Sequence, residues 1–460
     1  MTGAGDPRTP PAATAATRVG TDSGRRGGTG GRRLYTLGLW LAAPLVLARL
    51  ALRARRHPEY LHHLGERFGR YPLDGAAPAG RRDEPGPLFW LHAVSVGETQ
   101  AARPVIEALR ARVPDARFLL THMTPTGRAT ARELFGDGVR SVYLPYDFPF
   151  AVRRFLDRFR PDAGVIMETE LWPNLVSCCQ RSGVPLYLVN ARLSERSAAR
   201  YRRFPTLTAS ALRGLSGILA QADADADRLR ALGAPEVYVT GNVKFDALPP
   251  PSLVALGARW RAALQGRPVW IAASTRDGEE PLVIEALRAV QVPGALLLLV
   301  PRHPQRFDDV ARLLGQAGVR HARRSTPGAM ESLADRSIAV LLGDSMGEMA
   351  AYYAASDLAF VGGSLLPLGG QNLIEPCALG RPVLVGPHTF NFREVADQAI
   401  EAGAARRVED AAGLASEVTR LLADPAARDA MGEAGAAFAQ RHRGATARTV
   451  DVLLGGRPGG

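Results

Sequence analysis

From residue 87 onward, short apolar runs alternate with segments whose apolar residues recur at helical spacing. Most of the short runs are apolar throughout, which is typical of strands buried on both faces of a parallel sheet. The segments between them, such as 102–116 and 280–295, have the spacing of covering helices. The pattern therefore predicts α/β, doubly wound domains. The predicted strands are 89–96, 117–123, 141–146, 163–169, 185–191, 217–221 and 237–241, then 269–274, 295–302, 337–343, 358–363 and 382–387.

Three consecutive prolines, Pro249 to Pro251, separate the two series of strands. Proline continues neither a helix nor an inner strand, so we expect a linker over 247–252 that acts as a hinge. The chain has 460 residues, of which 46% are hydrophobic, enough for two domains with separate cores. We expect an N-terminal domain over 61–246 and a C-terminal domain over 253–460.

The N-terminal region differs in composition from the rest of the chain. Residues 1–33 are mostly Gly, Thr, Ala, Pro and Arg without an apolar period, which predicts a disordered basic extension. Residues 34–48 form an uncharged apolar run, so we expect an uncleaved membrane anchor helix over 34–60 that spans the bilayer or lies in its interface. Two alternatives stay open, a signal peptide and an amphipathic helix packed on its own domain.

The distribution of charge indicates which kind of molecule the protein binds, and the cysteine content indicates its redox setting. The formal net charge is +12, and residues 1–70 hold 12 arginines against 4 acids, a net +8. A basic excess concentrated beside an apolar run favours anionic membrane lipids over nucleic acid, which needs basic residues spread over a folded face. Three cysteines give neither a disulfide framework nor a zinc-ligand spacing, which indicates a reducing, cytosolic setting.

Polar motifs follow most of the predicted strands, where open parallel sheets bind ligands. Glu98 stands where the first strand gives way to a helix, after His92, Ser95 and Gly97. It has two interpretations of equal weight, a first-turn acid that stabilises its own helix and a general base in a cleft. A helix N-terminus lowers the pKa of a carboxyl, which counts against the base.

Two acids and one lysine are further candidates. Glu168 and Glu170 end a strand and, by strand alternation, are expected to share a face, where they would repel unless a cation lies between them. Solvated loop acids are the alternative. Lys244 is the one lysine among 57 basic Lys and Arg residues, which indicates that a compact ammonium is needed there; chance survival is the alternative.

The second half of the chain offers three places suited to an anion, which together suggest a nucleotide. Arg302 and His303 follow a strongly apolar strand, and the GDSMGEM turn has Ser345 at an expected helix N-cap. A Gly-rich loop over 362–371 precedes a helix expected to start near Asn372.

The sequence offers no metal site. Asp223, Asp225 and Asp227 are interpreted as first-turn acids, and in the absence of an HExxH or paired CxxC motif we expect no metal.

The ordered motifs resemble those of the 3-deoxy-D-manno-octulosonic acid (Kdo) transferases of lipopolysaccharide synthesis, over residues 34 to about 440. The motifs are HAVSVGE, MTPTG, YLPYD, METELWPN, NARLS, VTGNVKFD, PRHPQRF, MGEM, FVGGSLLPLGGQNLIEP and GPHTFNF. The resemblance implies a metal-independent, inverting glycosyltransferase of the GT-B type, with two Rossmann-like domains facing a cleft. The donor would be CMP-Kdo, bound by the C-terminal domain, and the acceptor a lipid A precursor (lipid IVA), bound by the N-terminal domain. The enzyme would be anchored to the cytoplasmic face of the inner membrane.

The resemblance also implies roles for individual residues. Glu98 would be the catalytic base, and Glu168 and Lys244 would support the transition state. Contacts to CMP would come from Pro301, Arg302, Met346, Gly347, Glu348, Asn372, Leu373, Ile374 and Glu375. Three rival interpretations remain: a GT-B glycosyltransferase that uses a UDP-sugar, a nucleotide-sugar epimerase, and a non-catalytic basic protein of the membrane surface.

Overall fold

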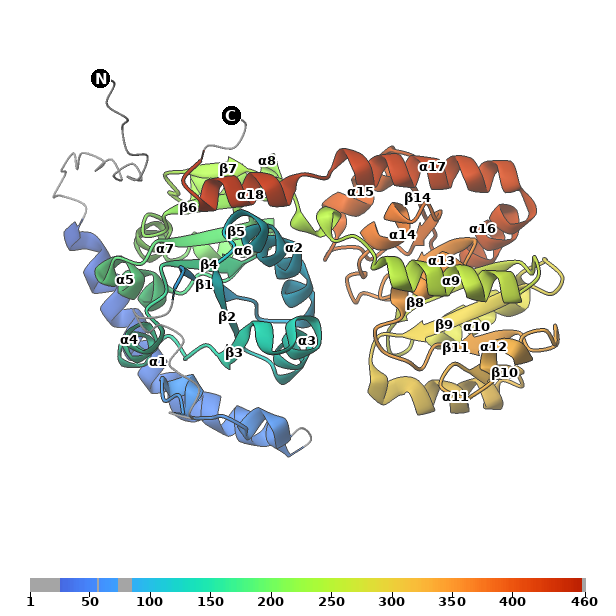
Figure 1. Cartoon of the computed structure of the whole chain (residues 1–460), viewed down its shortest axis with the longest axis horizontal. Helices are drawn as coiled ribbons and strands as arrows, with labels where there is room; N and C mark the ends of the chain where they lie inside the picture. Colours follow the sequence, from blue (N-terminus) through green and yellow to red (C-terminus); the bar gives the residue numbers. More distant parts are fainter. Residues whose placement is uncertain (1–24, 56–57, 73–84, 457–460) are drawn as a thin grey trace, which may run out of the picture.

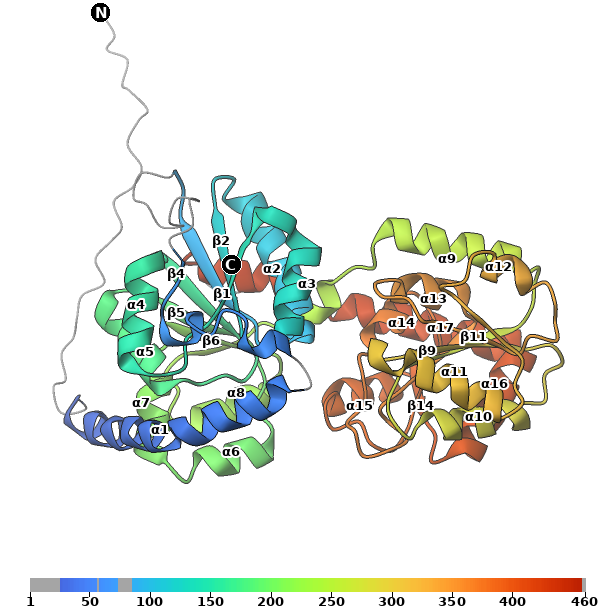
Figure 2. The same cartoon turned by 90° about the horizontal axis from the view of Figure 1, so that it is seen from below.

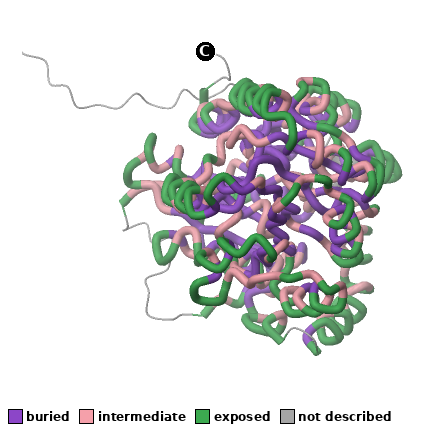
Figure 3. Tube along the Cα trace, turned by 90° about the vertical axis from the view of Figure 1, so that its right-hand side faces the viewer, coloured by how far each residue is buried: buried purple, intermediate pink, exposed green. Residues whose placement is uncertain are grey.

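The computed structural model describes residues 25–55, 58–72 and 85–456, which form two α/β domains side by side (Figure 1). Each domain contains a seven-stranded sheet in which every strand pair is parallel. The central strands of both sheets are buried along their length. The tube view shows buried residues mainly in the interior and exposed residues mainly at the periphery (Figure 3). These features confirm the predicted doubly wound architecture.

The sheet of the first domain has the order β3-β2-β1-β4-β5-β6-β7, and all seven predicted strands are present. Each strand is followed by a helical connection, as parallel strands require. The strands are β1 Leu88–His92, β2 Arg117–His122, β3 Arg140–Tyr143, β4 Ala163–Met167, β5 Leu186–Ala191, β6 Gly217–Ala220 and β7 Val237–Val239. The helices are α2 Val96–Arg112, α3 Pro125–Phe135, α4 Pro149–Phe159, α5 Pro173–Ser182, α6 Glu195–Tyr201, α7 Pro205–Leu212 and α8 Asp223–Ala231, with 3-10 turns η1 Pro58–Leu61, η2 Glu66–Phe68, η3 Gly136–Gly138 and η4 Val243–Asp246.

The sheet of the second domain has the order β10-β11-β9-β8-β12-β13-β14. Five of its strands were predicted, and the two edge strands, β10 (His321–Arg323) and β14 (Ala405–Arg407), were missed because each has three residues and little apolar character. The others are β8 Val269–Thr275, β9 Leu296–Pro301, β11 Val340–Leu342, β12 Leu358–Val361 and β13 Val383–Val385. The helices are α9 Pro251–Ala263, α10 Glu280–Ala289, α11 Phe307–Gln316, α12 Ala329–Ser332, α13 Met349–Ala355, α14 Ile374–Ala378, α15 Arg393–Glu401, α16 Ala411–Ala423 and α17 Pro425–Arg441, with the 3-10 turn η5 Pro304–Arg306.

The last helix, α18 (Ala445–Leu453), returns to the first domain, where Figure 1 shows it beside β7. Its apolar residues Ala445, Val450 and Leu453 are buried in the same core cluster as β1 and α2. Asp246 fixes its start by accepting hydrogen bonds from the backbone N–H groups of residues 444 (2.7 Å) and 446 (2.6 Å). The expected extension of the second domain to residue 460 is therefore wrong, because the apolar face of α18 belongs to the first domain.

The connection between the domains is shorter than the predicted linker over 247–252. Pro251 is the first residue of α9, a position where the missing N–H of proline is not needed. The irregular segment is therefore 247–250, between η4 and α9.

Helix α1 (Arg25–Ala54) lies along the first domain and contacts α5 and α7 (Figure 2). It includes residues 25–33, which we expected to be disordered, whereas residues 1–24 lie outside the described part. Its segment Gly30–Ala54 is long and apolar enough to cross a membrane. The outer face of the helix is apolar and exposed, at Leu34, Leu37, Leu41, Leu45 and Leu52.

Candidate active site

The order of each sheet reverses direction next to its first strand, which creates the crevice where open α/β sheets bind ligands. In the first domain this crevice lies between β1 and β4, whose carboxyl ends lead to Glu98 and Glu168. In the second domain it lies between β8 and β12, which lead to residues 276–280 and to the Gly-rich loop. The topology thus gathers the predicted residues at two crevices.

Glu98 lies in the first turn of α2 and caps that helix. Ser95 is the N-cap residue, and its hydroxyl donates to Glu98 Oε1 (3.2 Å) and accepts from the Glu98 N–H (3.4 Å). Oε2 accepts a hydrogen bond from the Val94 N–H (2.8 Å). The capping interpretation is therefore confirmed, and the geometry leaves the base interpretation open.

The pKa of Glu98 is raised to about 8, mainly by burial and next by the charge of Glu168. The hydrogen bonds from Val94 and Ser95 oppose this shift but do not offset it. The hydrogen bonds at the helix N-terminus thus lower the pKa of Glu98 as expected, but desolvation of the carboxylate outweighs them and the net shift is upward.

Glu168 has a left-handed backbone, with φ of 63°, directly after β4. Non-glycine residues in this region are strained and often lie at functional sites. Glu168 Oε1 accepts from Lys244 Nζ at 2.6 Å, whereas Glu170 accepts from the indole N–H of Trp172 at 2.5 Å. The two acids thus have different partners, and strand alternation does not describe them because the strand ends at Met167.

Lys244 connects the two domains. Its turn, η4, is held by Asn190, whose side-chain oxygen accepts from the Val243 N–H at 3.1 Å. Its Nζ lies 5.5 Å from the centre of the Phe392 ring, in the second domain. Close by, the Arg192 guanidinium donates to the carbonyl of Asn391. Glu98, Glu168 and Lys244 therefore cluster in the first domain, and Lys244 reaches the second.

On the second domain, Arg302 follows β9 after the buried Pro301, and burial lowers its pKa, as does the charge of Arg276. Glu375 opposes this shift and has a raised pKa itself because it is buried. Its Oε1 accepts from Asn372 Nδ2 at 3.2 Å. The adjacent Leu373 and Ile374 have buried side chains in an apolar core, and the Ile374 N–H donates to Asn372 Oδ1 (3.1 Å), so neither side chain is available to a ligand.

Arg276 was missed by the sequence analysis. It follows β8 and its side chain lies against Gly363. Within the described ranges, neither Arg276 nor Arg302 forms an ion pair within 4 Å, so both guanidinium groups are free for an anion. The signal that could have identified it is the one used for Arg302, a basic residue directly after a strongly apolar strand.

The turn before α13 differs from its prediction. The helix begins at Met349 with Glu348 as N-cap residue, so Ser345 is not the cap that we expected. The Glu348 carboxylate instead accepts from Ser345 Oγ (2.5 Å) and Arg324 Nη2 (2.8 Å). Met346 is 59% exposed and Gly347 has a positive φ of 79°, which leaves an open turn at the surface.

The Gly-rich loop is also not an open anion site, contrary to expectation. The buried carboxylate of Glu279 accepts hydrogen bonds from the N–H groups of Gly363 (2.6 Å), Ser364 (3.0 Å) and Leu365 (3.0 Å). An internal carboxylate therefore fills the place that a phosphate would take. Of the three predicted anion-binding places, Arg302 and the turn over 346–348 remain, and Arg276 adds a third candidate.

Of the three predicted first-turn acids of α8, Asp225 and Asp227 have structural partners, and Asp227 lies beyond the first turn, where it pairs with Arg230 (3.0 Å). Asp223 and Asp225 lie in its first turn, and Asp225 accepts from the Leu193 N–H at 2.7 Å. In the described part of the chain, no three His, Cys, Asp or Glu side chains are grouped to hold a metal ion. The expectation of metal-independent activity stays a prediction.

Comparison with known proteins now identifies the family. The profile of the family described as "3-Deoxy-D-manno-octulosonic-acid transferase (kdotransferase)" matches residues 62–247. The chain is 48% identical over 437 residues to the 3-deoxy-D-manno-octulosonic acid transferase of Bordetella pertussis, covering 92% of this chain and 99% of the relative. The chain belongs to the Kdo transferase family. The Kdo transferase of Haemophilus influenzae is 39% identical and matches 92% of this chain and 98% of its own length.

Solved structures show the fold of this Kdo transferase. The UDP-GlcNAc 2-epimerase of Neisseria meningitidis bound to UDP-GlcNAc matches with a TM-score of 0.56 and 15% identity, covering 80% of this chain and 99% of the epimerase. Anabaena Alr3699/HepE in complex with UDP matches with a TM-score of 0.55 and the same identity and coverage. The Kdo transferase therefore has the two-domain GT-B fold. At this identity the likeness concerns the fold alone.

Proposed function

We propose that this Kdo transferase moves Kdo from CMP-Kdo to a tetraacylated lipid A precursor (lipid IVA), by inverting transfer between its two domains. The cluster of Glu98, Glu168 and Lys244 carries the proposal, because it combines a carboxyl of raised pKa with a half-buried ion pair at the domain boundary. The free arginines at the opposing strand ends, Arg276 and Arg302, supply the complementary charge for an anionic donor.

Glu98 is the proposed general base. A carboxyl with a pKa of about 8 is well matched to proton abstraction near neutral pH. It takes the proton of an acceptor hydroxyl while that oxygen attacks the anomeric carbon of Kdo, and the bond to CMP breaks on the opposite face. Glu168 acts on this step through charge, because its carboxylate raises the pKa of Glu98, and Lys244 keeps that carboxylate in place.

The second domain is the proposed donor site. Arg276 and Arg302 stabilise the phosphate and the negative charge of the departing CMP. Glu375 and Asn372 hold the ribose hydroxyls through their carboxylate and amide oxygens. The exposed turn over 346–348 and the backbone of Leu373 complete the contacts to CMP.

We further propose that the enzyme works at the cytoplasmic face of the inner membrane, with α1 as its single N-terminal anchor. The first domain holds α1 at Thr36, which accepts from Asn174 Nδ2 (3.0 Å), and at Trp40, whose ring centre lies 4.8 Å from that of Phe148. A helix held in this way along its length presents its exposed apolar face to the bilayer and lies in the interface. The arginines that follow, Arg49, Arg53 and Arg55, face anionic lipid headgroups.

The test uses the purified full chain with CMP-Kdo and lipid IVA in detergent, and mass spectrometry of the lipid product. We expect the lipid to gain the mass of one or more Kdo residues. We also expect CMP to inhibit competitively and UDP to have little effect, which separates this donor from a UDP-sugar. Absence of any transfer would favour a non-catalytic protein of the membrane surface.

A further inference from the structure

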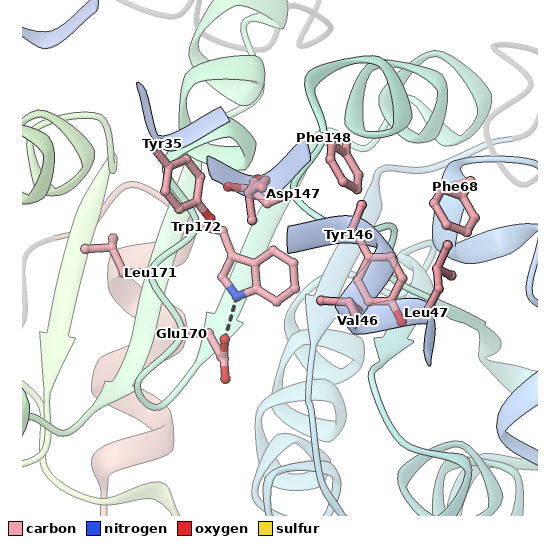
Figure 4. Close-up of a pocket in the computed structure, with 12 residues that line it drawn as sticks. Tyr35, Val46, Leu47, Phe68, Tyr146, Asp147, Phe148, Glu170, Leu171 and Trp172 are labelled. Carbon is pink, nitrogen blue, oxygen red and sulfur yellow. Dashed lines mark hydrogen bonds between the residues drawn. The ribbon is translucent and has the colours of Figure 1, made fainter. Parts of the chain in front are cut away.

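A cavity of about 290 Å³ lies between α1 and the first domain (Figure 4). One wall is formed by α1, through residues that include Leu39, Ala43 and Val46. The opposite wall is formed by the segments that follow β3 and β4, with Tyr146 and Trp172. The cavity exists only while α1 is docked, because that helix supplies a complete side of it.

The cavity walls favour an apolar occupant. Its two acidic residues already have partners: Asp147 accepts from the Leu175 N–H (2.7 Å) and the Asn174 N–H (3.0 Å), and Glu170 accepts from the Trp172 indole. Figure 4 shows Trp172 between Asp147 and Glu170, with Tyr146 and Val46 to one side. The other residues that line the cavity are aliphatic or aromatic, two tyrosines among them, and most of the lining is apolar, so the walls suit a hydrocarbon.

The cavity opens toward the apolar outer face of α1. Val46 and Leu47 both line it and remain 42% and 40% exposed, and the adjacent Leu45 is 73% exposed. A continuous apolar surface therefore leads from the proposed membrane face into the cavity. A lipid chain would follow this path without crossing a polar region.

The inner end of the cavity lies close to the proposed chemistry. Glu170 is two residues from Glu168, in the same loop, and its charge adds to the effects that raise the pKa of Glu98. The loop that carries Glu168 therefore also forms part of the cavity wall, through Glu170 and Leu171. An amphiphile with a reactive hydroxyl and a fatty chain matches this arrangement.

We propose that this cavity binds one fatty acyl chain of the acceptor lipid, an inference that rests on the proposed function. The docked α1 thus acts as part of the acceptor site as well as an anchor. A chain in the cavity places the sugar hydroxyl near Glu98 and selects acylated acceptors over deacylated ones. Each buried methylene strengthens binding by about fourfold, so a few of them decide the selection.

The first experiment fills the cavity by Ala43→Trp and compares it with Ala48→Trp, which places the same side chain on an exposed, non-lining position of α1. Transfer is measured in detergent with lipid IVA and with a water-soluble analogue whose acyl chains have been removed. We expect Ala43→Trp to raise KM for lipid IVA by about tenfold or more and to leave the KM of the analogue and of CMP-Kdo unchanged. Equal KM values for the two variants with lipid IVA would overturn the proposal.

The second experiment needs no variant and separates two sources of acyl chain. A lipid IVA analogue with a photoreactive diazirine on an acyl chain is crosslinked to the wild-type protein. We expect labelled peptides that contain residues 39–47 or 171–172, with labelling reduced by unlabelled lipid IVA and not by excess phospholipid. Labelling elsewhere, or competition by phospholipid, would overturn the proposal.

The outcomes distinguish this inference from the proposed function. If the wild type transfers Kdo but does not crosslink at the cavity, and Ala43→Trp has the same KM for lipid IVA as Ala48→Trp, only the acyl-chain site is contradicted. A protein that crosslinks at the cavity but transfers nothing contradicts the proposed function alone.

Discussion

At the scale of a single residue, Glu98 caps α2 and is also the proposed general base. Burial of its carboxylate raises its pKa, which suits the second role. Its place in the first turn of α2 was readable from the sequence, which left its role open between cap and base, and the structure shows the cap. Its raised pKa was not readable from the sequence, because burial and the nearby Glu168 depend on how β1 and β4 meet in the folded sheet. The sequence also singled out Lys244 by its rarity, but its partner 76 positions away in the chain became known only from the structure.

The raised pKa of Glu98 predicts a pH dependence. A general base works when deprotonated, so log kcat/KM should rise with pH, with a slope near 1, and level off above the pKa of about 8. The measurement is a pH profile of kcat/KM for the acceptor with saturating CMP-Kdo, because this parameter reports Glu98 before the acceptor binds. A profile that is already flat between about pH 5 and 7 would mean that Glu98 has an ordinary pKa or does not act as the base.

Lys244→Arg tests the need for a compact cation. The ammonium meets Glu168 Oε1 at 2.6 Å beside the Phe392 ring, and a planar guanidinium requires more room and a different approach. We expect kcat to fall by about 10 to 100-fold, with the melting temperature little changed. Arg230→Lys, in an exposed ion pair with Asp227, is the matched control and should retain full activity. A Lys244→Arg enzyme with the kcat of the wild type would show that position 244 does not require a lysine.

At the scale of secondary structure elements, strongly apolar strands were predictable and weakly apolar elements were not. All seven strands of the first sheet and the five apolar strands of the second follow from buried runs. The edge strands β10 and β14 and the return of α18 depend on tertiary contacts that no local pattern encodes. The Gly-rich loop illustrates the same limit, because its N–H groups are occupied by Glu279 from another element.

Glu279→Gln tests whether the Glu279 carboxylate holds the Gly-rich loop in place through its hydrogen bonds to the loop N–H groups. An amide has one acceptor oxygen and a donor group that would face the loop N–H groups, so buried donors lose their partners. We expect the free energy of unfolding to fall by about 2 to 3 kcal/mol and CMP binding to weaken, because the loop borders the donor crevice. Chemical denaturation and calorimetric CMP titration measure both. Glu285→Gln, exposed on α10, whose N-cap residue is Glu279, is the control, and an equal effect there would contradict the role of Glu279.

At the scale of the whole molecule, the two domains are joined by chain segments and by side-chain contacts, and α1 is attached to the first domain. Residues 247–250 and the segment between α17 and α18 join the domains covalently at two places, and Lys244 and Arg192 touch the second domain at Phe392 and Asn391. Helix α1 lies along the first domain with its apolar face outward. The sequence predicted two domains and an apolar N-terminal helix, but the position of that helix depends on contacts such as that between Trp40 and Phe148.

The most direct test of the central claim is transfer of labelled Kdo from CMP-Kdo to lipid IVA by the wild type and by Glu98→Gln, with CMP affinity measured in parallel. Glutamine preserves the acceptor oxygen for the Val94 N–H but cannot take a proton. The account predicts a loss of kcat by about 10² to 10⁴-fold with CMP affinity within about threefold of the parent. Comparable kcat in the two proteins would contradict the account and leave Glu98 as a helix cap alone.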